Sequence, residues 1–192
     1  MLKKIWFPLL FLALPFGGRA QQDPVLLARI DSMLQLTETS QVNRMLDFTY
    51  PKIFTIAPRE QLAEVLANNL NTEEYSSTLD SVKLMKLFPI FTIGDGQYAK
   101  LSHSMLMRMK FKEPVTDEQL AEGMAGMAEI FGKGNFRFDK PNNSFVISMT
   151  SYLVAIKDSY SKEWTFLNYR DDDPTIQLLL NDEVVNKLKE YK

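Results

Sequence analysis

The most regular alternation of hydrophobic and polar positions lies in residues 99–111, "AKLSHSMLMRMKF". Every second residue from 101 to 111 is apolar except His103, and the residues between them are polar except Leu106. Such alternation predicts a β-strand with one face in the core and the other in water. We therefore expect His103, the only histidine of the chain, to point inward and Lys100 to face solvent.

Before this strand, apolar residues recur at helical spacing and predict three helical segments. The first covers residues 24–36, and the second begins at residue 42 and kinks or ends near Tyr50, because Pro51 disfavours helix in the residue before it. The third covers residues 58–70. The apolar stripe expected to be buried on the third helix consists of Leu62, Val65, Leu66 and Leu70.

After residue 80 the pattern is mainly that of strands. Alternating or apolar runs predict strands over residues 81–92, 144–158 and 162–170, and the last of these is "KEWTFLNYR". One helix interrupts them: Thr116 and Gln119 have the spacing of a capping box, and "GKGN" supplies a terminating glycine. The buried side expected for that helix consists of Leu120, Met124, Met127 and Phe131.

Helices followed by long strands joined by turns indicate the α+β class. We expect a single domain over residues 21–192, with N-terminal helices packed on a curved, mostly antiparallel sheet and a short C-terminal helix. Long twisted strands curve, so helices on the concave face leave a cone with a pocket. No repeat or linker divides the chain.

Residues 1–20 have the pattern of a secretory signal peptide. Lys3 and Lys4 precede a short apolar run, and small residues follow it, which predicts cleavage after Ala20. The run is shorter than a membrane-spanning helix, so we expect a periplasmic or secreted protein without membrane insertion after cleavage.

The charge and cysteine content narrow the class of partner. Without residues 1–20 the chain has 19 basic and 24 acidic side chains, a net charge of −5. Nucleic-acid binding needs a basic surface, so no nucleic-acid partner is expected. With no cysteine, the core alone must stabilise the fold.

Several strings resemble a known fold family. These are "FTYPKIF", "IFGKGNFRFD", "AIKD" followed by "EWTFLNY", and "LLLNDEVVNKL". They are similar to small exported bacterial proteins of the nuclear-transport-factor-two-like, or cystatin-like cone, fold that have no assigned function. The likeness covers most of residues 21–192 and implies a pocket between the sheet and the first helices. The fold includes ketosteroid isomerase, scytalone dehydratase and polyketide cyclases beside many non-catalytic binding modules, so it implies no activity.

His103 is the sharpest candidate for chemistry. An inward imidazole can serve as a general acid or base when it has a partner, and is otherwise a neutral core residue with one hydrogen bond. No motif places a catalytic residue, and we expect no cofactor. One histidine and no cysteine do not make an ordinary zinc site, and Asp173 before Pro174 fits a helix cap better than a calcium ligand, so we expect no metal.

Three functions are compatible with these patterns. The preferred one is a non-catalytic binding module for a small, largely apolar ligand. The first alternative is an isomerase- or dehydratase-like enzyme that uses a pocket base, and the second is a protein-interaction module that forms a homodimer. The residues expected to line the ligand pocket are His103, Tyr50, Asn168, Trp164, Phe166, Met105 and Met107.

Overall fold

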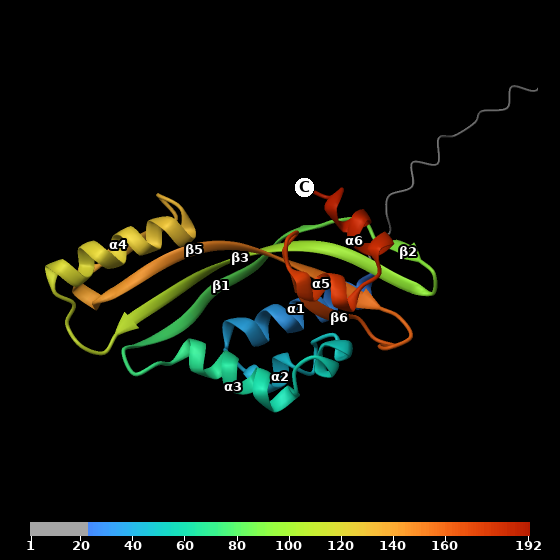
Figure 1. The fold of residues 1–192 in the computed structure, drawn as a ribbon, viewed down its shortest axis with the longest axis horizontal. Helices are drawn as coiled ribbons and strands as arrows, with labels where there is room; N and C mark the ends of the chain where they lie inside the picture. The colour runs from blue at the N-terminus through green and yellow to red at the C-terminus, as the bar shows by residue number, and fades with distance from the viewer. Residues whose placement is uncertain (1–22) are drawn as a thin grey trace, which may run out of the picture.

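The computed structural model describes residues 23–192 and confirms the α+β class. The expected signal peptide and its cleavage site lie outside the described residues. Within residues 23–192, eight helical segments and six strands follow one another along the chain (Figure 1). Their bounds are α1 Pro24–Glu38, α2 Val42–Met45, η1 Pro51–Thr55, α3 Arg59–Leu70, β1 Tyr75–Leu87, β2 Phe91–Ile93, β3 Gly96–Phe111, α4 Asp117–Phe131, β4 Phe136–Asp139, η2 Lys140–Asn142, β5 Ser144–Lys157, β6 Thr165–Tyr169, α5 Pro174–Leu179 and α6 Asp182–Lys189, where η1 and η2 are 3₁₀ helices.

All strand pairs are antiparallel and form one open, curved sheet. The three long strands β1, β3 and β5 lie side by side in that order. β2 forms a hairpin with β3, whereas β4 and β6 pair with different parts of the far edge of β5. β4 pairs as far as Ile147 and β6 from Tyr152, so the two short strands leave part of that edge between them.

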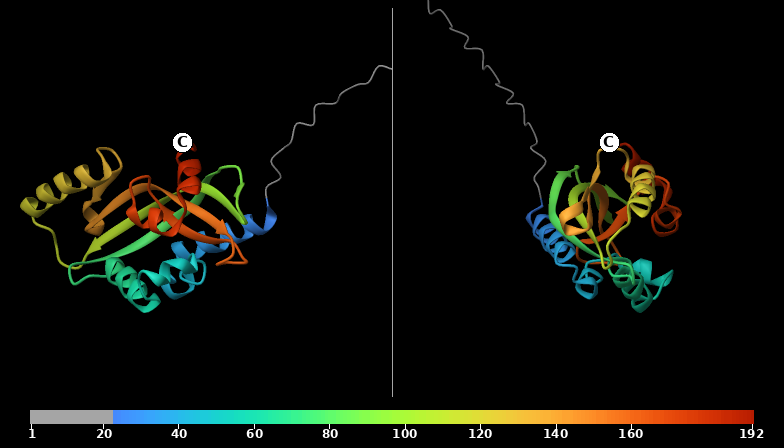
Figure 2. Two further views of the ribbon diagram at one scale, coloured as in Figure 1. Left: turned by 45° about the vertical axis from the view of Figure 1, so that its right-hand side comes forward. Right: turned by 90° about the vertical axis from the view of Figure 1, so that its left-hand side faces the viewer.

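Helices cover both faces of the sheet. α1, α2 and α3 lie along one side, α5 and α6 lie on the other, and α4 lies over the far end (Figures 1 and 2). Beneath α1, Leu26 and Ile30 pack with Leu101 and Phe166. The second core cluster joins α5 and α6 to the opposite sheet face, with Val184 and Leu188 as fully buried members.

The strand expected from the alternating pattern is β3, and His103 points inward as predicted, with 3% of its surface exposed. The prediction that Lys100 faces water is wrong, because α6 covers that face and leaves Lys100 only 4% exposed. The Lys100 ammonium donates hydrogen bonds to the carbonyl groups of Leu188, at 3.3 Å, and Tyr191, at 2.8 Å. The buried cation thereby binds one carbonyl in the last turn of α6 and one just beyond the end of the helix.

Local signals placed most helix ends correctly. Thr116 and Gln119 form the capping box of α4, and Gly132 follows that helix with a positive φ of 80°. Asp173 caps α5 by accepting from the N–H of Thr175, as expected. No helix within residues 23–192 is both long and apolar enough to cross a bilayer.

Three predicted helices differ most from the structure, and each of them has few buried side chains. The second helical segment is only a four-residue α2 followed by the 3₁₀ turn η1, and neither α3 nor α4 has a fully buried residue. The stripe of α3 stays half-exposed because it lines a cavity, and α4 leaves Met124 and Ile130 exposed. The expected burial of Val65 on α3 and of Met124 on α4 is therefore wrong, because both side chains are exposed.

Candidate functional site

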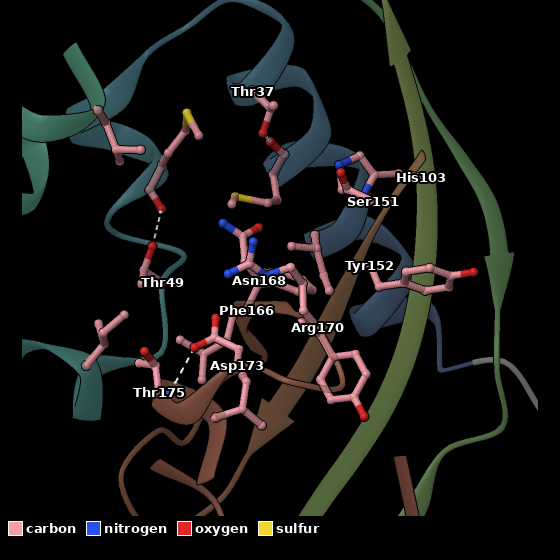
Figure 3. A pocket seen from close by; sticks show the side chains of 18 of the residues that line it. Thr37, Thr49, His103, Ser151, Tyr152, Phe166, Asn168, Arg170, Asp173 and Thr175 are labelled. Carbon is pink, nitrogen blue, oxygen red and sulfur yellow. Dashed lines mark hydrogen bonds between the residues drawn. The ribbon is translucent and has the colours of Figure 1, made fainter. Parts of the chain in front are cut away.

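A cavity of about 690 Å³ lies between the helical layer of α1–α3 and the sheet (Figure 3). Its volume is within the range of about 300–1,000 Å³ typical of small-molecule sites. α5 and the end of β6 form its remaining border. The cavity is therefore where the packed helices and the curved sheet face were expected to leave a pocket.

The sheet supplies the floor through residues that are neighbours across strands. His103 is directly opposite Ser151 of β5, and Leu153 is directly opposite Asn168 of β6, so their side chains share one face. Met105 extends this floor along β3. The helical side of the cavity is mostly apolar and consists of Met33, Thr37, Met45, Leu46, Thr49, Ile53, Leu62, Val65 and Leu66.

Backbone hydrogen bonds hold the irregular segment between α2 and η1 over this floor. The N–H of Phe166 donates to the carbonyl of Phe48 at 2.8 Å, and the N–H of Tyr50 donates to the carbonyl of Phe166 at 2.9 Å. β6, whose other edge pairs with β5, thus also binds this segment through one parallel bridge between Thr49 and Phe166, which positions Thr49 at the cavity wall.

His103 is the most unusual group in the cavity. Its Nδ1 atom is buried and has no hydrogen-bond partner within the described chain. Burial lowers the pKa of His103 below its ordinary value of 6.5. The imidazole is consequently neutral at pH 7 and offers one donor and one acceptor.

The structure brings together four of the seven residues expected at the pocket: His103, Met105, Phe166 and Asn168. Phe166 is buried in the floor, whereas Asn168 is exposed at the rim. Met107 lies further along the same strand, beyond the cavity lining. Of the three β3 residues expected at the pocket, His103 and Met105 therefore line the cavity, and Met107 does not.

The prediction that Tyr50 and Trp164 line the pocket is wrong. Both side chains are buried in the protein core instead. The Tyr50 hydroxyl donates to the Asp158 carboxylate at 2.6 Å, and its ring packs in the core beneath α5 and α6. The Trp164 indole N–H donates to Asp23 at 2.9 Å, next to the start of α1. Their polar atoms are satisfied by internal partners, which leaves them no contact with the cavity.

Arg170 is the main lining residue that sequence reasoning missed. It follows β6 directly, and Figure 3 shows its side chain and that of Asn168 pointing toward the same part of the cavity. No carboxylate of residues 23–192 lies within 4.0 Å of its guanidinium. The only sequence signal for Arg170 is its position two residues after Asn168, directly after the end of β6.

The polar groups of the cavity do not form a catalytic constellation within the described residues. His103 has no hydrogen bond to an acid, and burial is the only cause that shifts its pKa. The Asp173 carboxylate is engaged as the cap of α5. No cluster of three potential metal-binding side chains occurs in residues 23–192.

A second hollow of about 430 Å³ lies on the outer side of the α2–η1 segment. Its arginines already have partners: Arg29 binds Glu163 at 2.7 Å, and Arg59 binds Asp47 at 2.6 Å. This hollow consequently has no arginine left for a ligand, and the larger cavity is the better candidate site.

Comparison with known proteins adds no relative. No protein-family model, curated protein or solved structure matches the chain.

Proposed function

We propose that the protein is an exported, non-catalytic binding module of the nuclear-transport-factor-two-like fold, which holds a small, largely apolar ligand in the cavity beside His103. The observation that carries the proposal is a cavity of about 690 Å³ whose buried histidine has an unpartnered Nδ1 atom. Native proteins satisfy nearly all buried polar groups, and two of the exceptions in residues 23–192, His103 and Tyr169, belong to residues that line this cavity, which favours a partner that binds there.

The lining favours an apolar ligand body. Met33, Met45 and Met105 offer flexible, polarisable side chains that adapt to different shapes. Each buried methylene of a ligand contributes about 0.8 kcal/mol, so a chain of several carbons gives useful affinity without chemistry. The neutral His103 adds one directional contact to a hydroxyl or carbonyl group.

The geometry favours binding over the isomerase- or dehydratase-like alternative. A general base of that kind needs a pKa tuned near the working pH and a proton within reach. Burial instead lowers the pKa of His103, and no described acid bonds to it. The interaction alternative has one supporting observation, the exposure of Met124 and Ile130 on α4.

Binding of the neutral dye N-phenyl-1-naphthylamine tests the proposal. The mature chain should bind the dye saturably at one site, and Met105→Trp should weaken binding at least about tenfold by filling the cavity. Met85→Trp is the matched control, since Met85 lies on β1 with 63% of its surface exposed. Val65→Trp is a second blocking variant. Val65 lies on α3 at the helical wall with 49% of its surface exposed, so this substitution leaves the packing of the sheet unchanged.

Two results would contradict the proposal: absence of saturable dye binding by the folded protein, or equal binding by both blocking variants and the control. Size-exclusion chromatography with light scattering on the same samples tests the interaction alternative. A dimer that Ile130→Glu dissociates, together with no dye binding, favours that alternative. Mass spectrometry of the exported protein tests cleavage after Ala20.

A further inference from the structure

Resting on the proposed function, we propose that the ligand carries a single carboxylate, which binds the Arg170 guanidinium and the backbone N–H of Thr150, while its apolar body extends toward His103. This assigns the ligand class and the polar end of the site. The argument rests on the sheet edge, the charges at the cavity and the position of the buried histidine.

The sheet edge beside the cavity has a gap. β4 pairs with β5 as far as Ile147, and β6 pairs with β5 only from Tyr152. The N–H of Ser148 still donates to the carbonyl of Asn135 at 2.7 Å. Thr150 is then the next residue that can present backbone groups to this edge, and it lines the cavity.

Strand geometry fixes the direction of the Thr150 backbone groups. The carbonyl of Lys100 accepts from Phe88 beside β1, so Lys100 directs its backbone groups away from β5. Val154, the residue of β5 opposite Lys100, must therefore direct its backbone N–H and C=O groups toward the outer edge of β5. Thr150 is four residues away and has the same orientation, so its N–H meets the gap, where no strand within residues 23–192 pairs with it.

Arg170 places a cation at this end of the cavity. Among the lining residues that the structure describes, it is the one with a permanent positive charge. A guanidinium binds a carboxylate through two parallel hydrogen bonds, and a free backbone N–H adds a third. The Asn168 amide points toward the same part of the cavity (Figure 3) and can donate to the same group.

The remaining charge favours a monoanion over a phosphate. Asp173 also lines the cavity, and its carboxylate, which caps α5, repels a second negative charge. The neutral His103 on the floor does not compensate such a charge. One arginine beside one carboxylate therefore fits a monocarboxylate better than a phosphate dianion.

Displacement of the dye by three ligands of equal chain length tests the inference. Decanoate should displace it at lower concentration than 1-decanol and decyl phosphate at neutral pH, where decanoate is ionised. Arg170→Gln should weaken decanoate at least about tenfold and change decanol less than about twofold. Arg137→Gln is the control, because it removes the same charge from an exposed position on β4 that does not line the cavity.

Thr150→Pro removes the proposed N–H donor from an edge position where proline is tolerated, and should also weaken decanoate selectively. If decanol competes as well as decanoate, or Arg170→Gln behaves like Arg137→Gln, the inference is wrong although the cavity still binds the dye. If decyl phosphate is the strongest competitor, the assignment of a single charge is wrong. Absence of dye binding refutes the proposed function and this inference together, whereas selective loss of decanoate supports both.

Discussion

Replacement of His103 by leucine should stabilise the protein. Leucine has a similar volume and removes the ring nitrogen that is buried without a hydrogen bond. Leaving such a group unsatisfied costs about 1–3 kcal/mol. Because only one of the two ring nitrogens is in this state, we expect a gain near the lower limit, about 1 kcal/mol at pH 7.

The pH dependence makes this prediction specific to His103. Burial places its folded-state pKa below the unfolded value of 6.5, so both states are neutral above pH 6.5. As the pH falls below 6.5, the unfolded chain binds a proton first, and the wild type loses up to about 1.4 kcal/mol per pH unit until the folded-state pKa is reached. His103→Leu lacks this loss, so its advantage should widen in acid.

Urea unfolding followed by circular dichroism between pH 5 and 8 measures the difference. The chain has no other histidine, and carboxylates are the same in both proteins, so their contributions cancel in the comparison. At pH 7 the melting temperature should rise by about 2–4 °C. A variant less stable than the wild type, or a difference that does not change between pH 7 and 5, would refute the reasoning.

Two further predictions concern the aromatic residues buried against the protein. Tyr50→Phe removes the hydroxyl that donates to Asp158 and should cost about 1–2 kcal/mol in urea unfolding; Tyr160→Phe, on an exposed ring, should change stability by less than about 0.5 kcal/mol, and equal effects would contradict the assignment. Asp23→Ala removes both the cap of α1 and the acceptor of the Trp164 N–H, so it should cost about 2–3 kcal/mol. Because the hydrogen bond from Trp164 lowers the pKa of Asp23, this contribution should be complete above pH 3.8 and disappear as the pH falls through the folded-state pKa; a cost that persists fully in acid would refute it.

Local patterns in the sequence predicted the elements of the fold well. The alternation in residues 99–111 identified β3 and the inward direction of His103, because strand periodicity is a property of a single segment. The capping box at Thr116 and the cap at Asp173 were likewise confirmed, since each involves residues within one helical turn.

The sequence failed where a residue's environment depends on a distant segment. Lys100 has the pattern of a solvated residue, but α6 returns over that face about 85 residues later. Tyr50 has an inward position, yet which core it joins depends on Asp158 in the β5–β6 loop. For the same reason Arg170 was missed, because its place at the cavity follows from where β6 ends.

The environment of Lys100 gives the last residues of the chain a structural role that their terminal position conceals. Its ammonium lies 4.9 Å from the ring of Tyr152 and 4.6 Å from that of Tyr169, and its shortest bond is to the carbonyl of Tyr191, beyond the end of α6. Deletion of residues 190–192 would keep the whole of α6 but would leave the buried Lys100 ammonium with one carbonyl acceptor, that of Leu188. Residues 190–192 thus stabilise a buried charge on the central strand β3, and their loss would destabilise the sheet there.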